Sequence, residues 1–385
     1  MNAARLRRAS PERAGLDPRE IALLTEEVRN LTEGPEPWCA GAVVLAGRGP
    51  HLAAEAAAGW AVRYRAWDEE RGAGVELPPE ERVPVRVDTP FDLASLTKLF
   101  TAIATLQQVE RGALALGTPV AEILTDHPAA AAHGFTVRAL LTHTTGLRPE
   151  LPLYELPDDA ARHRALATEE PVAEPGTRRY SDLNPLLLQH LLERLTGQRL
   201  DQLVAEGITR PLGMTSTGFG PCPGAAATED ERRPWAKADR GMVRGLVHDE
   251  NAWALGGVAG HAGLFGTGHD LAVLCRVLLG GGAYGTARVL APEYTTLMLD
   301  EGLGFEVDKP WYMGELAGPL CAGHTGFTGT SLVVDRATDT FLVLLATTVH
   351  PRRRTPDSTP RARAATRLKR AVRDTGRTLP YEAAP

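Results

Sequence analysis

The sequence predicts a two-lobed α/β fold, in which a mainly helical lobe is inserted into an α/β lobe built from both ends of the chain. Strand-like apolar runs lie near the N-terminus and again after residue 329, whereas residues 113–245 carry helical patterns broken by glycine and proline. A length of 385 residues suits two or three domains or one large two-lobed protein. We expect the α/β lobe at residues 1–94 and 246–385, the helical lobe at residues 95–245, and a cleft between them.

The N-terminal part begins with a predicted helix, because apolar residues recur at helical spacing over residues 18–31. Two short strand candidates follow at residues 40–46 and 52–60, and glycine and proline at residues 47–50 join them. Residues 61–90 are polar and rich in charge, proline and glycine. We expect an irregular connection there.

The next segment, residues 91–111, is apolar at a period of 3.6 and predicts a long buried helix. Shorter helical patterns lie at residues 137–141, 185–195 and 200–208, and little between residues 113 and 245 alternates like a strand. The C-terminal part predicts a glycine-rich apolar stretch at 256–265, a helix at 270–279, strands at 329–335 and 340–347, and a basic closing helix at 361–374. We expect that last helix to cover the sheet and to turn its charged face to solvent.

Composition excludes several classes of protein. Charged residues are 23% and hydrophobic residues 43% of the chain, which excludes a disordered, collagenous or coiled-coil protein. The net charge of −6 argues against a nucleic-acid partner. The four cysteines are scattered without a CxxC pair, so neither a disulfide scaffold nor a structural zinc site is expected. We see no apolar run that could span a membrane and no secretory signal, and we expect a cytoplasmic protein.

The first candidate for chemistry is the Ser95-Leu96-Thr97-Lys98 segment. Serine and lysine at i and i+3 of one helix face the same side. A serine hydroxyl is a weak nucleophile until a base takes its proton, and a desolvated lysine can serve as that base whereas an arginine cannot. Lysine occurs only four times in the chain. Ser95 also lies at the start of its predicted helix, where free backbone N–H groups can stabilise an oxyanion.

Two further segments carry reactive groups. Tyr180-Ser181-Asp182 precedes an apolar helix, and a tyrosine beside cationic groups can shuttle protons; Ser181 or Asp182 could equally cap that helix. Residues 323–329 read GHTGFTG and precede a strand. Glycines this dense let a substrate approach the backbone closely, although an ordinary glycine-rich turn has the same composition.

Together these blocks resemble the serine β-lactamase and penicillin-binding-protein superfamily, in particular its class C β-lactamase and carboxylesterase branch. The family pattern S-x-x-K, Y-x-N and K-T-G corresponds here to SLTK at 95–98, YSD at 180–182 and HTG at 324–326. The flanks FDLASLTKLFTA, LLTHTTGL and PGTRRYSDLN are also similar. The resemblance spans nearly the whole chain and implies a mainly antiparallel sheet flanked by helices, with the catalytic cleft beside the helical lobe.

The resemblance also implies roles for individual residues. Ser95 corresponds to the acylated nucleophile, Lys98 to the residue that activates it, and Tyr180 to the residue that passes the proton to the leaving group. The backbone N–H groups of Ser95 and Phe327 correspond to the oxyanion hole. The residues that correspond to substrate-binding positions are Asp182, His324, Thr325 and Gly326. The family uses no metal or other cofactor, so we interpret His248 as part of a hydrogen-bond network rather than a metal ligand.

Two residues depart from the family pattern. Asp182 replaces an asparagine, and because a carboxylate only accepts hydrogen bonds, we expect it to hold Lys98 charged and to shift proton transfer toward Tyr180, unless Asn184 shares the role. His324 replaces a lysine and removes a permanent cation that β-lactamases use against a substrate carboxylate. If His324 titrates near its ordinary pKa of about 6.5, activity on anionic substrates should fall as the pH rises past that value.

Three functional hypotheses follow. The first is a carboxylesterase or transacylase that acts on a small ester or amide, for example in secondary metabolism, with water, an amine or an alcohol as acyl acceptor. The second is a D-alanyl-D-alanine peptidase or β-lactamase, and the third is a catalytically idle binding protein that kept the fold. The intact Ser95, Lys98 and Tyr180 argue against the third. The sequence does not indicate an oligomeric state.

Overall fold

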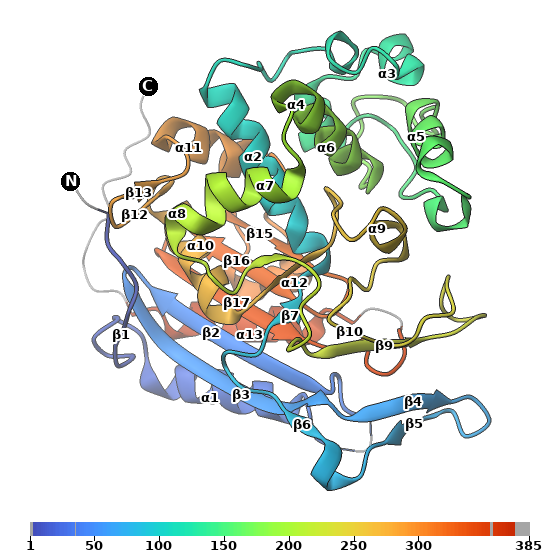
Figure 1. The fold of residues 1–385 in the computed structure, drawn as a ribbon. Helices are drawn as coiled ribbons and strands as arrows, with labels where there is room; N and C mark the ends of the chain where they lie inside the picture. Colours follow the sequence, from blue (N-terminus) through green and yellow to red (C-terminus); the bar gives the residue numbers. More distant parts are fainter. Residues whose placement is uncertain (1–2, 35, 355–356, 374–385) are drawn as a thin grey trace.

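A twisted β-sheet with helices on both faces forms the centre of the molecule (Figure 1). The computed structural model describes residues 3–34, 36–354 and 357–373. The sheet order is β1-β3-β2-β17-β16-β15-β14, with β6 paired to β3, and all pairs are antiparallel except β1 with β3. The strands are β1 (Arg7–Arg8), β2 (Gly41–Arg48), β3 (His51–Val62), β6 (Val83–Pro84), β14 (Glu306–Val307), β15 (Cys321–Thr325), β16 (Ser331–Asp335) and β17 (Thr340–Ala346).

The central strands are apolar on both faces because both faces are covered. In β17, Phe341, Val343 and Leu345 belong to one hydrophobic cluster, whereas Leu342 and Leu344 belong to a second cluster on the opposite face. This alternation is the period-2 geometry of a strand, in which successive side chains point to opposite faces. The predicted α/β fold with a largely antiparallel sheet flanked by helices is confirmed.

Helices α1 (Pro18–Asn30) and α13 (Thr359–Ala371) pack against each other and cover one face of the sheet (Figure 1). Helix α10 (Gly268–Leu279) contacts β2, β16 and β17 on the other face. The short α12 (Pro310–Met313) lies beside α13, and α11 (Pro292–Glu301) contacts β14. The closing helix ends at Ala371, and residue 374, the predicted last residue, lies outside the described residues.

The helical segments lie mainly between residues 97 and 212, above the sheet in Figure 1. They are α2 (Thr97–Glu110), α3 (Pro128–Ala132), α4 (Val137–Leu141), α5 (Asp159–Ala167), α6 (Leu183–Thr196), α7 (Leu200–Val204) and α8 (Arg210–Leu212), with α9 (Glu250–Ala254) further along the chain. Helix α2 contacts α6 and α7 and is buried along almost its whole length. Within the described ranges, none of these helices combines the length and apolar composition that a membrane span requires.

Three sequence predictions about local structure are wrong. The helix predicted for residues 91–111 begins later, because β7 (Phe91–Asp92) and a 3₁₀ turn at Ala94–Leu96 precede α2. The irregular connection predicted at 61–90 contains a hairpin, β4 (Tyr64–Asp68) and β5 (Ala73–Glu76), and the edge strand β6. The middle segment contains β8 (Gly218–Phe219), β9 (Ala227–Glu231) and β10 (Gly241–Arg244). These strands are short or charged, so they lack the apolar alternation that would reveal them.

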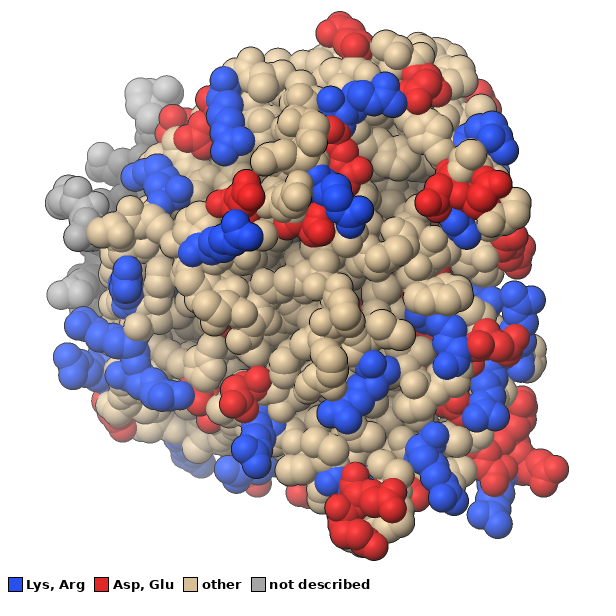
Figure 2. Space-filling model, in the orientation of Figure 1, with Lys and Arg blue, Asp and Glu red and all other residues tan. Residues whose placement is uncertain are grey.

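The remaining short strands tie the segments together. Strand β11 (Leu264–Gly266) pairs with both β7 and β8 and so holds the segment before Ser95 in place. Strands β12 (Ala283–Tyr284) and β13 (Ala287–Arg288) form a hairpin. On the face shown in Figure 2, basic and acidic side chains are interspersed rather than gathered over one element.

A core substitution tests the packing of the central sheet. Leu45 is fully buried in β2, so Leu45→Ala removes apolar contacts and leaves a cavity. The free energy of unfolding should fall by about 2–5 kcal/mol, measured by urea denaturation. The control Leu246→Ala changes an exposed leucine and should leave stability nearly unchanged. Equal effects of the two substitutions would contradict the assigned packing.

Candidate active site

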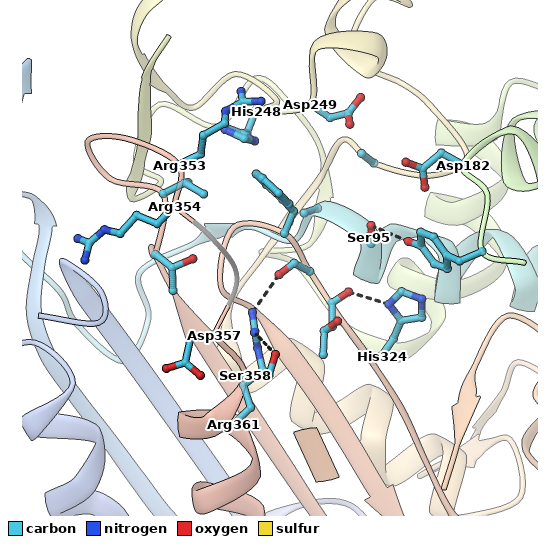
Figure 3. A pocket seen from close by; sticks show the side chains of 18 of the residues that line it. Ser95, Asp182, His248, Asp249, His324, Arg353, Arg354, Asp357, Ser358 and Arg361 are labelled. Carbon is cyan, nitrogen blue, oxygen red and sulfur yellow. Dashed lines mark hydrogen bonds between the residues drawn. The ribbon is translucent and has the colours of Figure 1, made fainter. Parts of the chain in front are cut away.

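A cavity of about 700 Å³ lies where the segments carrying Ser95 and Tyr180 meet the end of β15 and the loop after β17 (Figure 3). Its lining includes every sequence-predicted site residue except Lys98, namely Ser95, Tyr180, Asp182, His324, Thr325, Gly326 and Phe327. Lys98 is buried directly behind Ser95. Segments more than 80 residues apart in sequence therefore converge on one cavity.

Ser95 occupies the 3₁₀ turn that precedes α2, and its hydroxyl contacts two candidate proton carriers. Lys98 Nζ donates a hydrogen bond to Ser95 Oγ at 2.7 Å. The Tyr180 hydroxyl donates to the same oxygen at 3.1 Å. A dashed line at Ser95 in Figure 3 marks the hydrogen bond to Tyr180. A hydroxyl, an ammonium and a phenol thus meet at one oxygen atom.

The backbone before Ser95 is strained. Ala94 has φ +47°, a left-handed conformation that residues with a side chain rarely adopt. The buried Asp92 carboxylate holds it there, since Oδ1 accepts from the Ala94 N–H at 2.8 Å and Oδ2 accepts from the His248 N–H at 2.7 Å. Sequence patterns gave no sign of this role for Asp92.

Asp182 forms an ion pair with Lys98, with Oδ1 and Nζ 2.8 Å apart. Burial alone would lower the pKa of Lys98, but the Asp182 carboxylate and Tyr180 outweigh it, so the pKa is raised above its ordinary value. The carbonyl of His261 accepts a further hydrogen bond from Nζ at 3.2 Å. Lys98 is therefore an ammonium ion at neutral pH.

Tyr180 is held between two imidazole rings. The His143 ring stacks on it with centroids 4.9 Å apart, and the His324 ring lies 6.0 Å away at a tilt. Burial raises the pKa of Tyr180, although Lys98 acts in the opposite direction, so the phenol is protonated at rest. No sequence pattern indicated this contact of His143 with Tyr180.

The family pattern has an asparagine where this chain has Asp182. Asn184 does not supply the missing amide group beside Lys98. Its Oδ1 accepts from Thr145 Oγ1 at 2.7 Å, and its Nδ2 lies 3.2 Å from His143 Nδ1. The amide thus fixes the imidazole that supports Tyr180 and points away from Lys98. Of Asp182 and Asn184, only Asp182 lies next to the Lys98 ammonium.

The HTG segment forms the end of β15 and the turn after it. Gly326 is required there, because a Cβ atom would come within 2.1 Å of Thr330 Oγ1 and 2.7 Å of the Leu93 carbonyl. Within the described chain, the backbone N–H groups of Ser95 and Phe327 donate to no other protein group. Both residues line the cavity, so these two amides are available to an oxyanion.

His324 differs from the expectation in its charge. Nδ1 donates to the Thr325 carbonyl at 2.7 Å, which leaves the lone pair on Nε2. Burial and the nearby Lys98 ammonium lower the pKa of His324 to about 3. The predicted loss of activity on anionic substrates above pH 6.5 is therefore wrong, because this imidazole is already neutral below that pH.

The loop after β17 and the start of α13 bring residues to the pocket that sequence patterns did not indicate. Arg361 is only 6% exposed, and its Nη2 donates to the Gly326 carbonyl at 3.1 Å. The basic residues of this helix predicted a solvated face, so Arg361 was missed. Aromatic side chains also line the cavity, namely Trp38, Trp311 and Phe327. The pocket consequently offers both a guanidinium and apolar walls.

His248 belongs to a buried network beside Phe327. Its Nε2 lies 2.7 Å from Glu229 Oε2, and its ring stacks on Phe327 with centroids 5.6 Å apart. Burial opposes protonation, but Glu229 raises the pKa of His248. Arg353 bridges Glu229 and Glu250. This network fits the predicted hydrogen-bond role of His248 and fixes the wall that carries Phe327.

Two groups of side chains near the pocket have the spacing of metal ligands. One comprises Asp182, Asp249 and His261, and the other comprises Glu229, Glu231 and His248. The Lys98 ammonium already neutralises Asp182, and Arg353 and Arg240 already pair with Glu229 and Glu231. Because cations of the chain occupy these carboxylates, neither group needs a metal ion for charge balance.

The chain is similar to known proteins over most of its length. A family model described as "Beta-lactamase" matches residues 29–366. A protein of Escherichia coli (strain K12), provisionally named a D-alanyl-D-alanine carboxypeptidase, is 32% identical over 331 residues, which are 75% of this chain and 76% of the relative.

Two solved structures share the fold. EstCE1, a hydrolase with promiscuous acyltransferase activity, superposes with a TM-score of 0.66 at 22% identity and covers 92% of this chain and 98% of its own. A penicillin-binding-protein homologue from Caulobacter crescentus gives a TM-score of 0.67 at 20% identity and covers 91% of this chain and 97% of its own. The predicted β-lactamase-like fold is confirmed.

Removing the Asp182 charge tests its influence on Lys98. Asp182→Asn deletes the negative charge 2.8 Å from Nζ, so the pKa of Lys98 should fall. The pH at which an active-site serine probe labels Ser95 at half its maximal rate should move down by about 1–3 pH units. Intact-protein mass spectrometry against pH measures the rate.

The matched control is Asp159→Asn, which removes an aspartate that is 89% exposed in α5. That variant should follow the unaltered pH profile. An unchanged or upward-shifted midpoint in Asp182→Asn would contradict the assigned ion pair.

Proposed function

The chain belongs to the Beta-lactamase family, and from that premise we propose that it is a serine hydrolase or acyltransferase that acts on small esters or amides through an acyl-enzyme on Ser95. The observation that carries the proposal is the contact of Ser95 Oγ with Lys98 Nζ at 2.7 Å and with the Tyr180 hydroxyl at 3.1 Å. A serine with two proton carriers in hydrogen-bond reach has the arrangement of an activated nucleophile.

In the proposed first step, Ser95 Oγ adds to the substrate carbonyl carbon. The carbonyl oxygen becomes negative and accepts hydrogen bonds from the N–H groups of Ser95 and Phe327. Because the phenol of Tyr180 is protonated at rest, it gives its own proton to the leaving alcohol or amine as it takes the proton of Ser95 Oγ, while the Lys98 ammonium stabilises the charge that develops, and the bond to the leaving group breaks. Because Asp182 holds Lys98 as an ammonium ion, Tyr180 carries the larger part of this transfer.

In the second step, water or another nucleophile attacks the acyl-enzyme. Tyr180 gives its proton to Ser95 Oγ as the acyl bond breaks and takes the proton of the incoming nucleophile in exchange, so the side chains end in their starting state. An amine or alcohol acceptor in place of water would make the enzyme a transacylase. EstCE1, which shares the fold, is named as a hydrolase with promiscuous acyltransferase activity. This supports both water and an amine or alcohol as acyl acceptors.

The pocket favours substrates with an apolar part. Trp311 and Phe327 are about half exposed at the cavity and offer aromatic surfaces to an acyl or aryl group. The neutral His324 places no charge at the position where the family pattern has lysine. We therefore propose a carboxylesterase or transacylase on a small ester as the first function, and His324, Thr325 and Gly326 as the residues that border the bound acyl group.

A second function, a D-alanyl-D-alanine peptidase, has a specific observation in its favour. The Escherichia coli relative with that provisional name is 32% identical over three quarters of this chain. Arg361 also brings a guanidinium to the Gly326 carbonyl, where it could attract a substrate carboxylate. A panel of a p-nitrophenyl ester, a D-alanyl-D-alanine peptide and a penicillin distinguishes these functions by which compound acylates the protein and how fast the adduct is lost.

Removal of the nucleophile tests the proposal directly. Ser95→Ala should lose the covalent adduct seen by intact-protein mass spectrometry, and ester hydrolysis should fall by more than about 10³-fold. Ser10→Ala, which changes a serine outside the pocket, should keep both. The proposal is contradicted if Ser95→Ala forms the same adduct as the unaltered protein, or if the unaltered protein forms no adduct with any compound of the panel. The hypothesis of a catalytically idle binding protein would then be the one that remains.

Removal of one hydroxyl group tests the role of Tyr180. Tyr180→Phe keeps the ring that stacks on His143 but deletes the hydrogen bond to Ser95 Oγ. The rate of acylation should fall by about 10²–10⁴-fold, the usual contribution of a general acid–base group. Stopped-flow release of p-nitrophenol measures it. The control is Tyr154→Phe, which changes a tyrosine outside the cavity lining. Equal acylation rates in the Tyr154→Phe and Tyr180→Phe variants would contradict the proton-transfer role of Tyr180.

A further inference from the structure

Three histidines meet in the helical part of the molecule, outside the proposed active site. His127 precedes α3, His163 belongs to α5 and His190 belongs to α6. One ring nitrogen from each lies within 4.8 Å of the others. The ring centroids are 4.8 Å apart for His127 and His163, 5.3 Å for His163 and His190, and 5.7 Å for His127 and His190. The three imidazoles thus form one compact cluster.

The distance between two of the nitrogens fits a tetrahedral metal ion. His127 Nε2 and His190 Nδ1 are 3.4 Å apart. Two imidazole nitrogens bound to one zinc ion at about 2.0–2.1 Å in tetrahedral geometry are separated by about 3.4 Å. For a direct hydrogen bond between two ring nitrogens, the same distance is long. The pair makes a long hydrogen bond in this structure, and its spacing also matches that of two ligands of one ion.

Asp126 supports the rings from outside. Its Oδ1 lies 3.1 Å from His127 Nδ1, so this nitrogen carries the proton and Nε2 keeps its lone pair directed at His190. Its Oδ2 lies 3.0 Å from His163 Nε2. Arg194 holds the carboxylate at 3.1 Å. A carboxylate behind a ligating histidine is the usual outer partner in zinc sites, where it fixes the tautomer and the ring orientation.

The remaining requirements of a metal site are also met. His127 is buried, and His163 and His190 are partly buried, so the protein shields the space between the three rings from bulk solvent. A cavity of about 240 Å³ is lined by His163 and His190. It gives an ion a path to the rings and leaves room for a water molecule as the fourth ligand.

We propose that His127, His163 and His190 form a binding site for a divalent transition-metal ion, with Zn²⁺ as the favoured occupant. Three imidazoles select zinc, cobalt, nickel or copper over magnesium and calcium, which prefer oxygen ligands. The ion would join the start of α3 to α5 and α6. Since α6 begins directly after Tyr180 and Asp182, the bound ion would stabilise the helix that positions this part of the pocket.

The test uses the full-length, metal-free protein titrated with Co²⁺ and, separately, with Zn²⁺. One Co²⁺ per chain should bind and give the visible absorption bands of four-coordinate cobalt. His163→Gln and His190→Gln should each weaken binding by at least about tenfold, and Asp126→Asn, which removes only the outer carboxylate, by about 10–100-fold. Saturating Zn²⁺ should raise the thermal unfolding midpoint of the unaltered protein but not of the His190→Gln variant.

Two control variants separate this site from the others. His269→Gln removes a partly exposed histidine on α10, and Asp249→Asn removes a member of the ligand-like group beside Lys98. Both should bind one Co²⁺ as tightly as the unaltered protein. Three results would overturn the proposal. They are no binding of Co²⁺ by the unaltered protein, binding by the His163→Gln and His190→Gln variants as tight as that of the unaltered protein, and loss of binding in Asp249→Asn only. None of these readouts depends on hydrolytic activity.

Discussion

The burial of one ammonium group governs how the functional part of the molecule is arranged. Lys98 is removed from water in the first turn of α2, and a charge in that position needs partners that compensate for its lost hydration. The partners come from three separate segments: Ser95 Oγ, the carboxylate of Asp182 and the carbonyl of His261. The position of Tyr180 over the ammonium follows from the same requirement, since its ring centroid lies 5.0 Å from Nζ.

A second layer of buried polar groups holds the first in place. Asp92 links the strained Ala94 to the His248 backbone, and His248 in turn stacks on Phe327. A carboxylate thus connects the turn that carries the nucleophile with the wall that carries one of the two free amides. Buried networks of this kind are rigid when every member has a partner. The geometry around Ser95 therefore depends on Asp92, a buried residue outside the cavity lining.

Sequence reasoning predicted the parts of the fold that have a strong period or a motif. The apolar run at residues 340–347 and the helical spacing of residues 18–31 predicted β17 and α1, and the SLTK, YSD and HTG blocks predicted which segments share a cavity. The predicted helix at residues 91–111 starts too early, because residues 91–96 are as apolar as the helix α2 that follows them.

Other features depend on tertiary contacts that no local pattern encodes. Arg361 has the same sequence signature as its exposed neighbours in α13, and only the packing of that helix brings its guanidinium to Gly326. The charge of His324 depends on burial and on Lys98, which lies 226 positions earlier in the chain. The acidic sequence of β9 is typical of a solvent-exposed segment. The fold nevertheless buries the side chains of Glu229 and Glu231 against arginines.

The left-handed backbone at Ala94 limits how the chain can diverge. A side chain branched at Cβ clashes with its own backbone at positive φ, so valine, isoleucine and threonine are disfavoured at this position, whereas glycine and asparagine are tolerated. Gly326 lies opposite, where a Cβ atom would approach that of Ala94 to 3.3 Å, so the two sites cannot both gain bulk. Substitutions that reshape this pocket should therefore be tolerated better at its outer walls, where Trp38 and Trp311 lie, than at Ala94 and Gly326.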